Sequence, residues 1–151
     1  MITEYVTYET ALAMKRKGFA EYTSHCIVKY DEDFIYDEDI NHPESHRKGD
    51  IRVYEYNHRN EEDDNAVSLP SIDEAVNWLR EKGYHISFEP SYDRNTDEVL
   101  YYAYVLESNG KKTYVINEPM YYDICSERAV DIVVNMLKDD YPYSFEYKKY
   151  L

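Results

Sequence analysis

The strongest constraint on the fold is a switch of hydrophobic period within residues 68–88, SLPSIDEAVNWLREKGYHISF. Ser71, followed three positions later by Glu74, forms the capping box that starts a helix, and Gly83 is typical of the residue that ends one. Between them the apolar side chains recur at helical spacing. After Gly83 they alternate at every second residue, as in a half-buried strand. The segment therefore predicts a helix that leads directly into a strand.

Two further segments have the apolar spacing of helices. In residues 125–140, CSERAVDIVVNMLKDD, apolar residues stand at positions i, i+3, i+4, i+7 and i+8, counted from Ala129. Ser126 is the expected N-cap of this helix. In residues 7–19, TYETALAMKRKGF, Thr7 is the expected N-cap and a glycine ends the pattern. We therefore expect three helices in all.

The remaining apolar segments have the composition of strands. The hairpin signal is strongest in residues 99–118, VLYYAYVLESNGKKTYVINE, where Asn109–Gly110 is typical of a type I′ turn. Three other segments alternate or run apolar as half-buried strands do: HCIVKY (25–30), IRVYEY (51–56) and, as an edge strand, YPYSFEYKKYL (141–151).

One domain is the expected organisation, because 151 residues can bury a sizeable core. We expect an α+β fold over residues 1–151, with about three helices packed on an antiparallel or mixed sheet of five to seven strands. The predicted helical segments 7–19 and 71–84 share one order of cap, apolar pair, basic residue, glycine and aromatic residue before a strand. This internal similarity leaves open a division into two halves, 1–64 and 65–151. The polar segment 57–65 is predicted to be an exposed loop that joins them.

Acidic residues and tyrosine dominate the composition. The net charge is −14, from 31 acidic and 17 basic residues, and there are 19 Tyr against 4 Phe and 1 Trp. This charge opposes direct binding to nucleic acid or to an anionic membrane. The sequence contains no run of 18 apolar residues, the length that a membrane span would need. The segment MITEYVTYET lacks the features of a signal peptide. We therefore expect a cytoplasmic protein whose Cys26 and Cys125 are reduced, buried thiols.

The acidic residues are concentrated between positions 30 and 64. This segment contains 13 acidic and 4 basic residues, a local balance of 4 − 13 = −9, interleaved with tyrosines. Such a surface either faces only water or contacts a basic partner. The candidate interaction face consists of Asp31, Asp33, Tyr36, Asp37, Asp39, Tyr54 and Tyr56.

Two acidic stretches approach the spacing of a calcium-binding EF-hand loop, which requires Gly at position 6 and Glu at position 12. A loop that starts at Asp37 has His42 and Lys48 at these positions. The stretch DRNTDEVLYYAY, 93–104, has Glu98 and Tyr104 there instead, and is predicted to be a hairpin turn before a strand at residue 99. The sequence therefore predicts no metal site and no cofactor.

The sequence contains no catalytic motif that we recognise. It has no HExxH, GxSxG, Walker loop or GxGxxG, and only 4 Gly with which to build a phosphate-binding loop. His25 and Cys26 are neighbours on a predicted strand and so point to opposite faces; a Cys–His pair would need a histidine from elsewhere. We assign no catalytic residue, and the sequence favours a non-catalytic role while leaving enzyme activity open.

Three segments of the chain resemble a group of bacterial proteins. TYETALAMKRKGF, LPSIDEAVNWLREKGYHISF and the closing helix introduced by YYDICSERAV are similar to small uncharacterised proteins of Bacteroides-type bacteria, their prophages and mobile elements. The similarity covers most of the chain in the order of its elements, and WLREK is its most specific part. The acidic residues 30–64 depart from it. The resemblance implies an accessory protein of a mobile element and no site residue.

Three functions are compatible with these observations. The first is a non-catalytic protein-interaction module, whose partner is a basic protein or a second copy of the chain in a homodimer. The second is a nucleic-acid mimic that inhibits a host DNA- or RNA-binding protein. The third is a small metal-dependent hydrolase or nuclease that uses scattered carboxylates.

Overall fold

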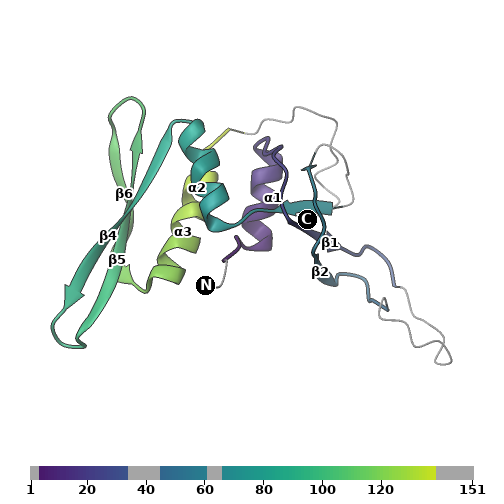
Figure 1. Ribbon diagram of the computed structural model, residues 1–151, viewed down its shortest axis with the longest axis horizontal. Helices are drawn as coiled ribbons and strands as arrows, with labels where there is room; N and C mark the ends of the chain where they lie inside the picture. Colours follow the sequence, from purple (N-terminus) through teal and green to yellow (C-terminus); the bar gives the residue numbers. More distant parts are fainter. Residues whose placement is uncertain (1–3, 34–44, 61–65, 139–151) are drawn as a thin grey trace.

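The computed structural model describes residues 4–33, 45–60 and 66–138. Its helices lie in the middle of the molecule, with one three-stranded sheet on either side (Figure 1). The elements in chain order are α1 (Tyr8–Arg16), β1 (His25–Lys29), β2 (Ile51–Tyr54), β3 (Ala66–Leu69), α2 (Ile72–Glu81), β4 (Tyr84–Asp93), β5 (Glu98–Glu107), β6 (Lys112–Met120) and α3 (Tyr122–Val134).

The α+β class is confirmed, with three helices and six antiparallel strands in the described residues. The strands form two separate sheets, in the orders β2–β1–β3 and β4–β5–β6, where the sequence suggested one larger sheet. The physical reason lies in the connections. β4, β5 and β6 follow one another and pair as hairpins, so that this sheet is complete by itself, and α2 separates β4 from β3.

Helix α2 begins and ends as its sequence predicts. The Ser71 hydroxyl accepts a hydrogen bond of 3.1 Å from the Glu74 backbone N–H, and Glu74 Oε1 accepts one of 3.0 Å from the Ser71 N–H. Gly83 has a φ of +92°, a conformation that side chains disfavour, and β4 begins at the next residue. Trp78 and Leu79 face the core.

The β5–β6 hairpin is confirmed, but its turn is not of type I′. A type I′ turn needs positive φ at both central residues. Among the described non-glycine residues only Asp97 has a positive φ, so Asn109 does not qualify. Instead the Gly110 N–H donates to the Glu107 carbonyl at 2.8 Å, and Gly110 itself has a φ of +90°. This is the three-residue loop in which a β-turn is followed by a left-handed glycine.

The β4–β5 turn is confirmed at the stretch that resembled a calcium loop. Asp93 accepts a hydrogen bond of 2.9 Å from the Asn95 N–H, and Asp97 accepts one from the Tyr92 hydroxyl. Strand β5 then begins at Glu98. The oxygens of this stretch therefore stabilise a hairpin turn.

Helix α3 starts earlier than its sequence suggests. The N-cap is Tyr121, and Ser126 is completely buried inside the helix, where its hydroxyl donates to the Asp123 carbonyl at 3.0 Å. The prediction of Ser126 as the cap is therefore wrong. Ile132 and Met136, expected in the apolar stripe, are each 39% exposed. The buried stripe of α3 is instead Cys125, Ala129, Val130, Val133 and Val134, all completely buried.

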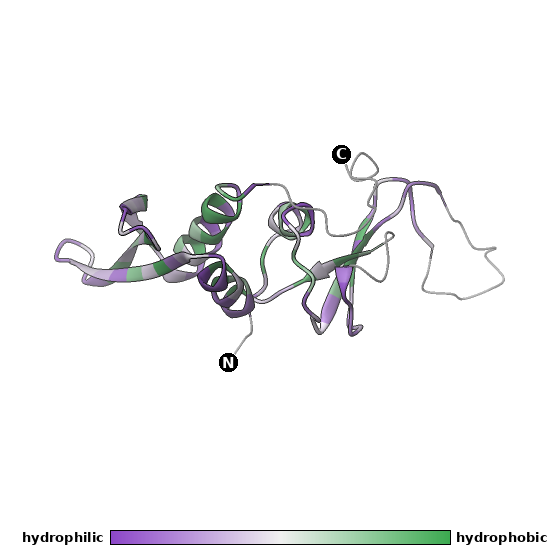
Figure 2. Cartoon of the chain, turned by 90° about the horizontal axis from the view of Figure 1, so that it is seen from above, coloured by the Kyte–Doolittle hydropathy of each residue, from purple (hydrophilic) through white to green (hydrophobic). Residues whose placement is uncertain are grey.

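The core lies where the helices meet each other and the sheets. Apolar residues are frequent in the central helices (Figure 2). Phe19, which follows α1, packs edge-on against Trp78 of α2 with ring centroids 5.4 Å apart. Within α1, completely buried Lys15 donates from Nζ to the Ala66 carbonyl of β3 at 2.8 Å. Helix α1 therefore connects the core to the β2–β1–β3 sheet.

Some predictions concern residues outside the described ranges, among them the edge strand 141–151 and most of the EF-hand-like loop from Asp37. None of the helices in the described residues combines the length and the apolar composition of a membrane span.

Candidate functional site

The structure describes four of the seven residues of the predicted interaction face. Asp31 and Asp33 are exposed after β1, and Asp33 Oδ1 accepts a hydrogen bond of 2.7 Å from the Lys48 N–H. Asp33 thus helps to hold the 45–50 segment against the end of β1. Tyr36, Asp37 and Asp39 lie outside the described residues.

The two tyrosines of that face lie nearer the other end of β1. Tyr54 pairs with Cys26, whereas Asp31 follows the end of β1 at which Lys29 pairs with Ile51. Tyr54 is half-buried, and Tyr56 is 65% exposed. Both tyrosines line a hollow of about 360 Å³ on the β2–β1–β3 sheet.

Polar residues are buried beside this hollow, where the sequence predicted only an exposed loop. His58 and Asn60 are buried, which corrects that prediction for these two residues of segment 57–65. His58 Nδ1 is 2.8 Å from the Ser68 hydroxyl. Asn60 accepts a hydrogen bond of 2.8 Å from the Ser68 N–H and donates one of 2.9 Å to the Phe19 carbonyl. These bonds fix the 58–60 segment to β3 and to the end of α1.

The buried thiol of Cys26 lies near this polar group. Cys26 is the cross-strand partner of Ser68, so both side chains lie on one face of the sheet. His58 lines the same hollow as Cys26. The fold thus supplies a histidine near Cys26 from another segment, and its Nδ1 is engaged by Ser68. We interpret this group as a structural element of the first sheet.

The second sheet has one covered and one uncovered face. Helix α3 lies along one side of it (Figure 1), and Ile86, Ala103, Val105 and Ile116 are buried there. Alternate residues point away from the helix. We call this outer surface the tyrosine face; it consists of Glu89, Tyr102, Tyr104, Lys112, Tyr114 and Asn117.

A shift of strand register adds Asn117 to the tyrosine face. Tyr114 and Asn117 are three residues apart, so in a regular strand they would point to opposite sides. Tyr104 pairs with Tyr114 but Ala103 pairs with Ile116, so β6 carries one extra residue at this point. The resulting bulge places Tyr114 and Asn117 on the same side, where both line one hollow.

Aromatic and charged groups are closely arranged on this face. The rings of Tyr104 and Tyr114 have centroids 5.5 Å apart. Lys112 Nζ lies 4.2 Å from the centroid of Tyr104 and 5.2 Å from that of Tyr114. The Tyr114 hydroxyl donates a hydrogen bond of 3.0 Å to Glu89 Oε2. A hollow of about 350 Å³ lies on this face and is lined by Glu89, Tyr102, Tyr114 and Asn117.

Comparison with known proteins provides no relative from which a role could be transferred. No protein-family model matches the chain, and no curated protein or solved structure matches it.

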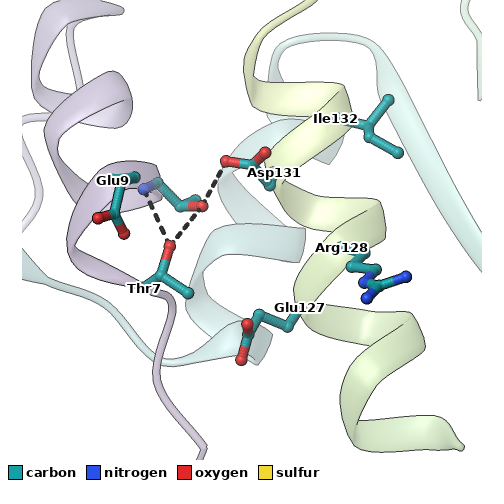
Figure 3. A pocket seen from close by; sticks show the side chains of 7 residues that line it. Thr7, Glu9, Glu127, Arg128, Asp131 and Ile132 are labelled. Atoms are coloured by element: carbon teal, nitrogen blue, oxygen red, sulfur yellow. Dashed lines mark hydrogen bonds between the residues drawn. The ribbon is translucent and has the colours of Figure 1, made fainter.

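A third hollow, of about 330 Å³, lies between α1 and α3 (Figure 3). The Thr10 hydroxyl donates a hydrogen bond of 2.6 Å to Asp131 Oδ1 and is itself 3.1 Å from the Thr7 hydroxyl. Thr7 also caps α1 by accepting from the Thr10 N–H at 3.2 Å. Glu9, Glu127 and Arg128 line the rim. The chain of hydroxyls joins the start of α1 to α3, which is a structural role.

Titratable groups near α3 are shifted towards their neutral forms. Burial raises the pKa of the Cys125 thiol and is the main cause of the raised pKa of Tyr122. The Tyr121 hydroxyl donates to Glu98 at 2.9 Å, and this bond raises the pKa of Tyr121. Among the described residues, no three His, Cys, Asp or Glu side chains are grouped so that they could hold a metal ion.

Proposed function

We propose that the chain is a non-catalytic protein-interaction module of the bacterial cytoplasm, and that its tyrosine face is the contact surface. The observation that carries the proposal is the clustering of Tyr102, Tyr104 and Tyr114 on a sheet face that no described element covers. The similarity of the helical segments to proteins of Bacteroides-type prophages and mobile elements supports a role as an accessory protein of such an element.

Tyrosine suits this role for physical reasons. Its ring gives a large apolar contact at a small cost in conformational entropy. Its hydroxyl can form a hydrogen bond with water or with a partner. Tyr114 is 44% exposed, and its hydrogen bond to Glu89 together with its contact to Lys112 restricts its side chain before any partner arrives. A contact surface ordered in advance loses less entropy on binding.

The test compares the wild-type chain with a Tyr102→Ser/Tyr114→Ser variant. We expect the wild type to form a homodimer in size-exclusion chromatography with light scattering, or to capture a specific protein from a bacterial lysate. The variant should lose that association and keep its circular dichroism spectrum. A wild-type chain that stays monomeric and captures no partner would contradict the proposal, as would a variant that associates normally.

The exposed acids after β1 favour a second candidate, a mimic of nucleic acid. Asp31, Glu32 and Asp33 are all exposed, in a chain of net charge −14. Regularly spaced carboxylates can occupy the basic site of a DNA- or RNA-binding protein. Neutralising Asp31, Asp33, Asp37 and Asp39 together should then weaken a salt-sensitive association with a basic partner. Unchanged binding by that variant would remove this candidate.

A further inference from the structure

We propose that the hollow of the tyrosine face binds a Lys or Arg side chain, and that the partner of this face is a basic protein segment. The inference rests on the proposed function and specifies the chemistry of the partner. Three observations carry it: a cation already held by the tyrosines, a single carboxylate in the hollow, and the charge of the whole chain.

The first observation is the position of Lys112. Its Nζ lies 4.2 Å from the ring centroid of Tyr104 and 5.2 Å from that of Tyr114, well inside the range of cation–π attraction. The electron-rich faces of these rings therefore already attract one ammonium group of the chain itself. The hollow is next to this pair and shares the Tyr114 ring with it.

The second observation is the lining of the hollow. Of its four lining residues, Glu89 alone is charged, and two of the other three are tyrosines. Glu89 is the cross-strand partner of Tyr102, and its Oε2 accepts the Tyr114 hydroxyl bond. A carboxylate fixed between aromatic rings suits a guanidinium or ammonium group, because it can accept a charge-assisted hydrogen bond while the rings contact the alkyl stem.

The third observation is the net charge of −14. It attracts a basic segment over long range, and it makes a homodimer through this face the weaker of the two associations considered above. It also opposes single-stranded nucleic acid, which could otherwise stack on exposed tyrosines but requires a positively charged groove. Among partners that could use an aromatic face, the charge therefore favours a basic one.

The test is fluorescence anisotropy with a short labelled peptide of alternating Arg and Ser. A matched peptide carries citrulline, an uncharged isostere, in place of Arg. We expect Glu89→Gln to weaken binding of the Arg peptide by about tenfold, because a charge-assisted bond is lost. Lys112→Met should strengthen it, because a resident positive charge beside the hollow is removed. The citrulline peptide should bind weakly to every variant.

Two controls separate the site from general attraction. Glu127→Gln removes one exposed acid on α3, away from the tyrosine face, and should change the Kd by less than roughly twofold. Tyr114→Phe keeps the ring but removes the hydroxyl that positions Glu89, and should weaken binding less than Glu89→Gln does. Thermal unfolding of each variant checks that the sheet remains folded.

The outcomes distinguish this inference from the proposed function. If Glu89→Gln and Glu127→Gln weaken the Arg peptide equally, or if free arginine binds as tightly as the peptide, the inference is wrong. If Lys112→Met weakens binding of the Arg peptide, the positive charge of Lys112 does not oppose the bound cation, and the inference is again wrong. In each case, loss of association in the Tyr102→Ser/Tyr114→Ser variant would still support an interaction module.

Discussion

The hydroxyl of Tyr114 on β6 donates a hydrogen bond of 3.0 Å to Glu89 on β4, and so joins the two edge strands of a sheet across its central strand. Direct contacts between strands that are not neighbours need long side chains on one face. Here Tyr114 is the cross-strand partner of Tyr104, and this regular pairing places both tyrosines on the outer face. The bond connects strand geometry to the chemistry of the proposed contact surface.

Replacing Tyr114 separates the contributions of its hydroxyl and its ring. Tyr114→Phe should lower the free energy of unfolding by no more than about 1 kcal/mol, because the lost bond is exposed to water. Tyr114→Ala should cost more, since it also removes the ring contacts with Tyr104 and Lys112. Urea unfolding followed by circular dichroism measures both. Equal costs for the two variants would show that the ring contacts contribute nothing.

The capping box of α2 provides a second prediction. Ser71→Ala removes the hydroxyl that accepts the Glu74 N–H and should destabilise the fold by about 1 kcal/mol. Glu74→Gln is the matched control, because glutamine also serves in a capping box and should retain most of the stability. The midpoint of thermal unfolding shows which of the two variants is less stable. A larger loss of stability for Glu74→Gln than for Ser71→Ala would contradict the geometry.

Asn60 should be among the most sensitive polar positions. Asn60→Ala removes the hydrogen-bond partner of the Ser68 N–H and of the Phe19 carbonyl, and both of these residues are buried. We expect a loss of at least about 2 kcal/mol, because each unsatisfied buried group costs about 1–3 kcal/mol. Asn95→Ala, in the exposed β4–β5 turn, should change stability by less than about 0.5 kcal/mol. Similar values for both variants in chemical denaturation would refute the buried network.

The link between α1 and α3 gives a fourth prediction. Thr10→Val preserves the shape of a buried side chain but removes the hydroxyl that donates to Asp131. The loss should be about 1–3 kcal/mol, because a hydrogen bond to a charged group is stronger than a neutral one. Thr10→Ser, which keeps the hydroxyl, should recover much of it. Amide hydrogen exchange in α1 provides the local measurement, and unchanged protection in Thr10→Val would argue against the link.

The stability of the chain should fall in alkaline solution. Burial raises the pKa of Cys125 and Tyr122 in the folded state, so their neutral forms stabilise the fold below the pKa of the unfolded chain. That contribution is lost as the pH rises from about 8.5, the ordinary thiol pKa, through the raised folded values. Cys125→Ala should flatten the decline. A free energy of unfolding that is constant between about pH 8 and 10 would contradict this.

Local signals in the sequence predicted much of the fold. The capping box, the glycine stop and the change of period near Gly83 are decided by neighbours in the chain, and the structure confirms α2 and β4 from them. The same holds for the two hairpins of the second sheet. In α3 the local signal misled, because Ser126 has the chemistry of a cap but is covered by the core.

The candidate site could not be predicted, because it depends on relations between distant residues. The hollow of the tyrosine face depends on a bulge that brings Asn117 to the side of Tyr114, and no sequence period marks the bulge. His58 belongs to a polar segment, yet it is buried beside Ser68 of β3. The division into two sheets likewise depends on how the strands pair, because β4, β5 and β6 pair with one another and α2 separates them from β3.

The order β2–β1–β3 has a consequence for the time course of folding. Strand β1 lies at the centre of its sheet and needs β3, which comes only after β2 and a long intervening segment, whereas β4, β5 and β6 pair with their immediate successors. Closing a long loop costs more chain entropy than closing a hairpin, and low contact order speeds folding. Although β1 leaves the ribosome first, its sheet is therefore completed later than its position in the chain suggests. The meander that carries the tyrosine face forms as a rapid local unit.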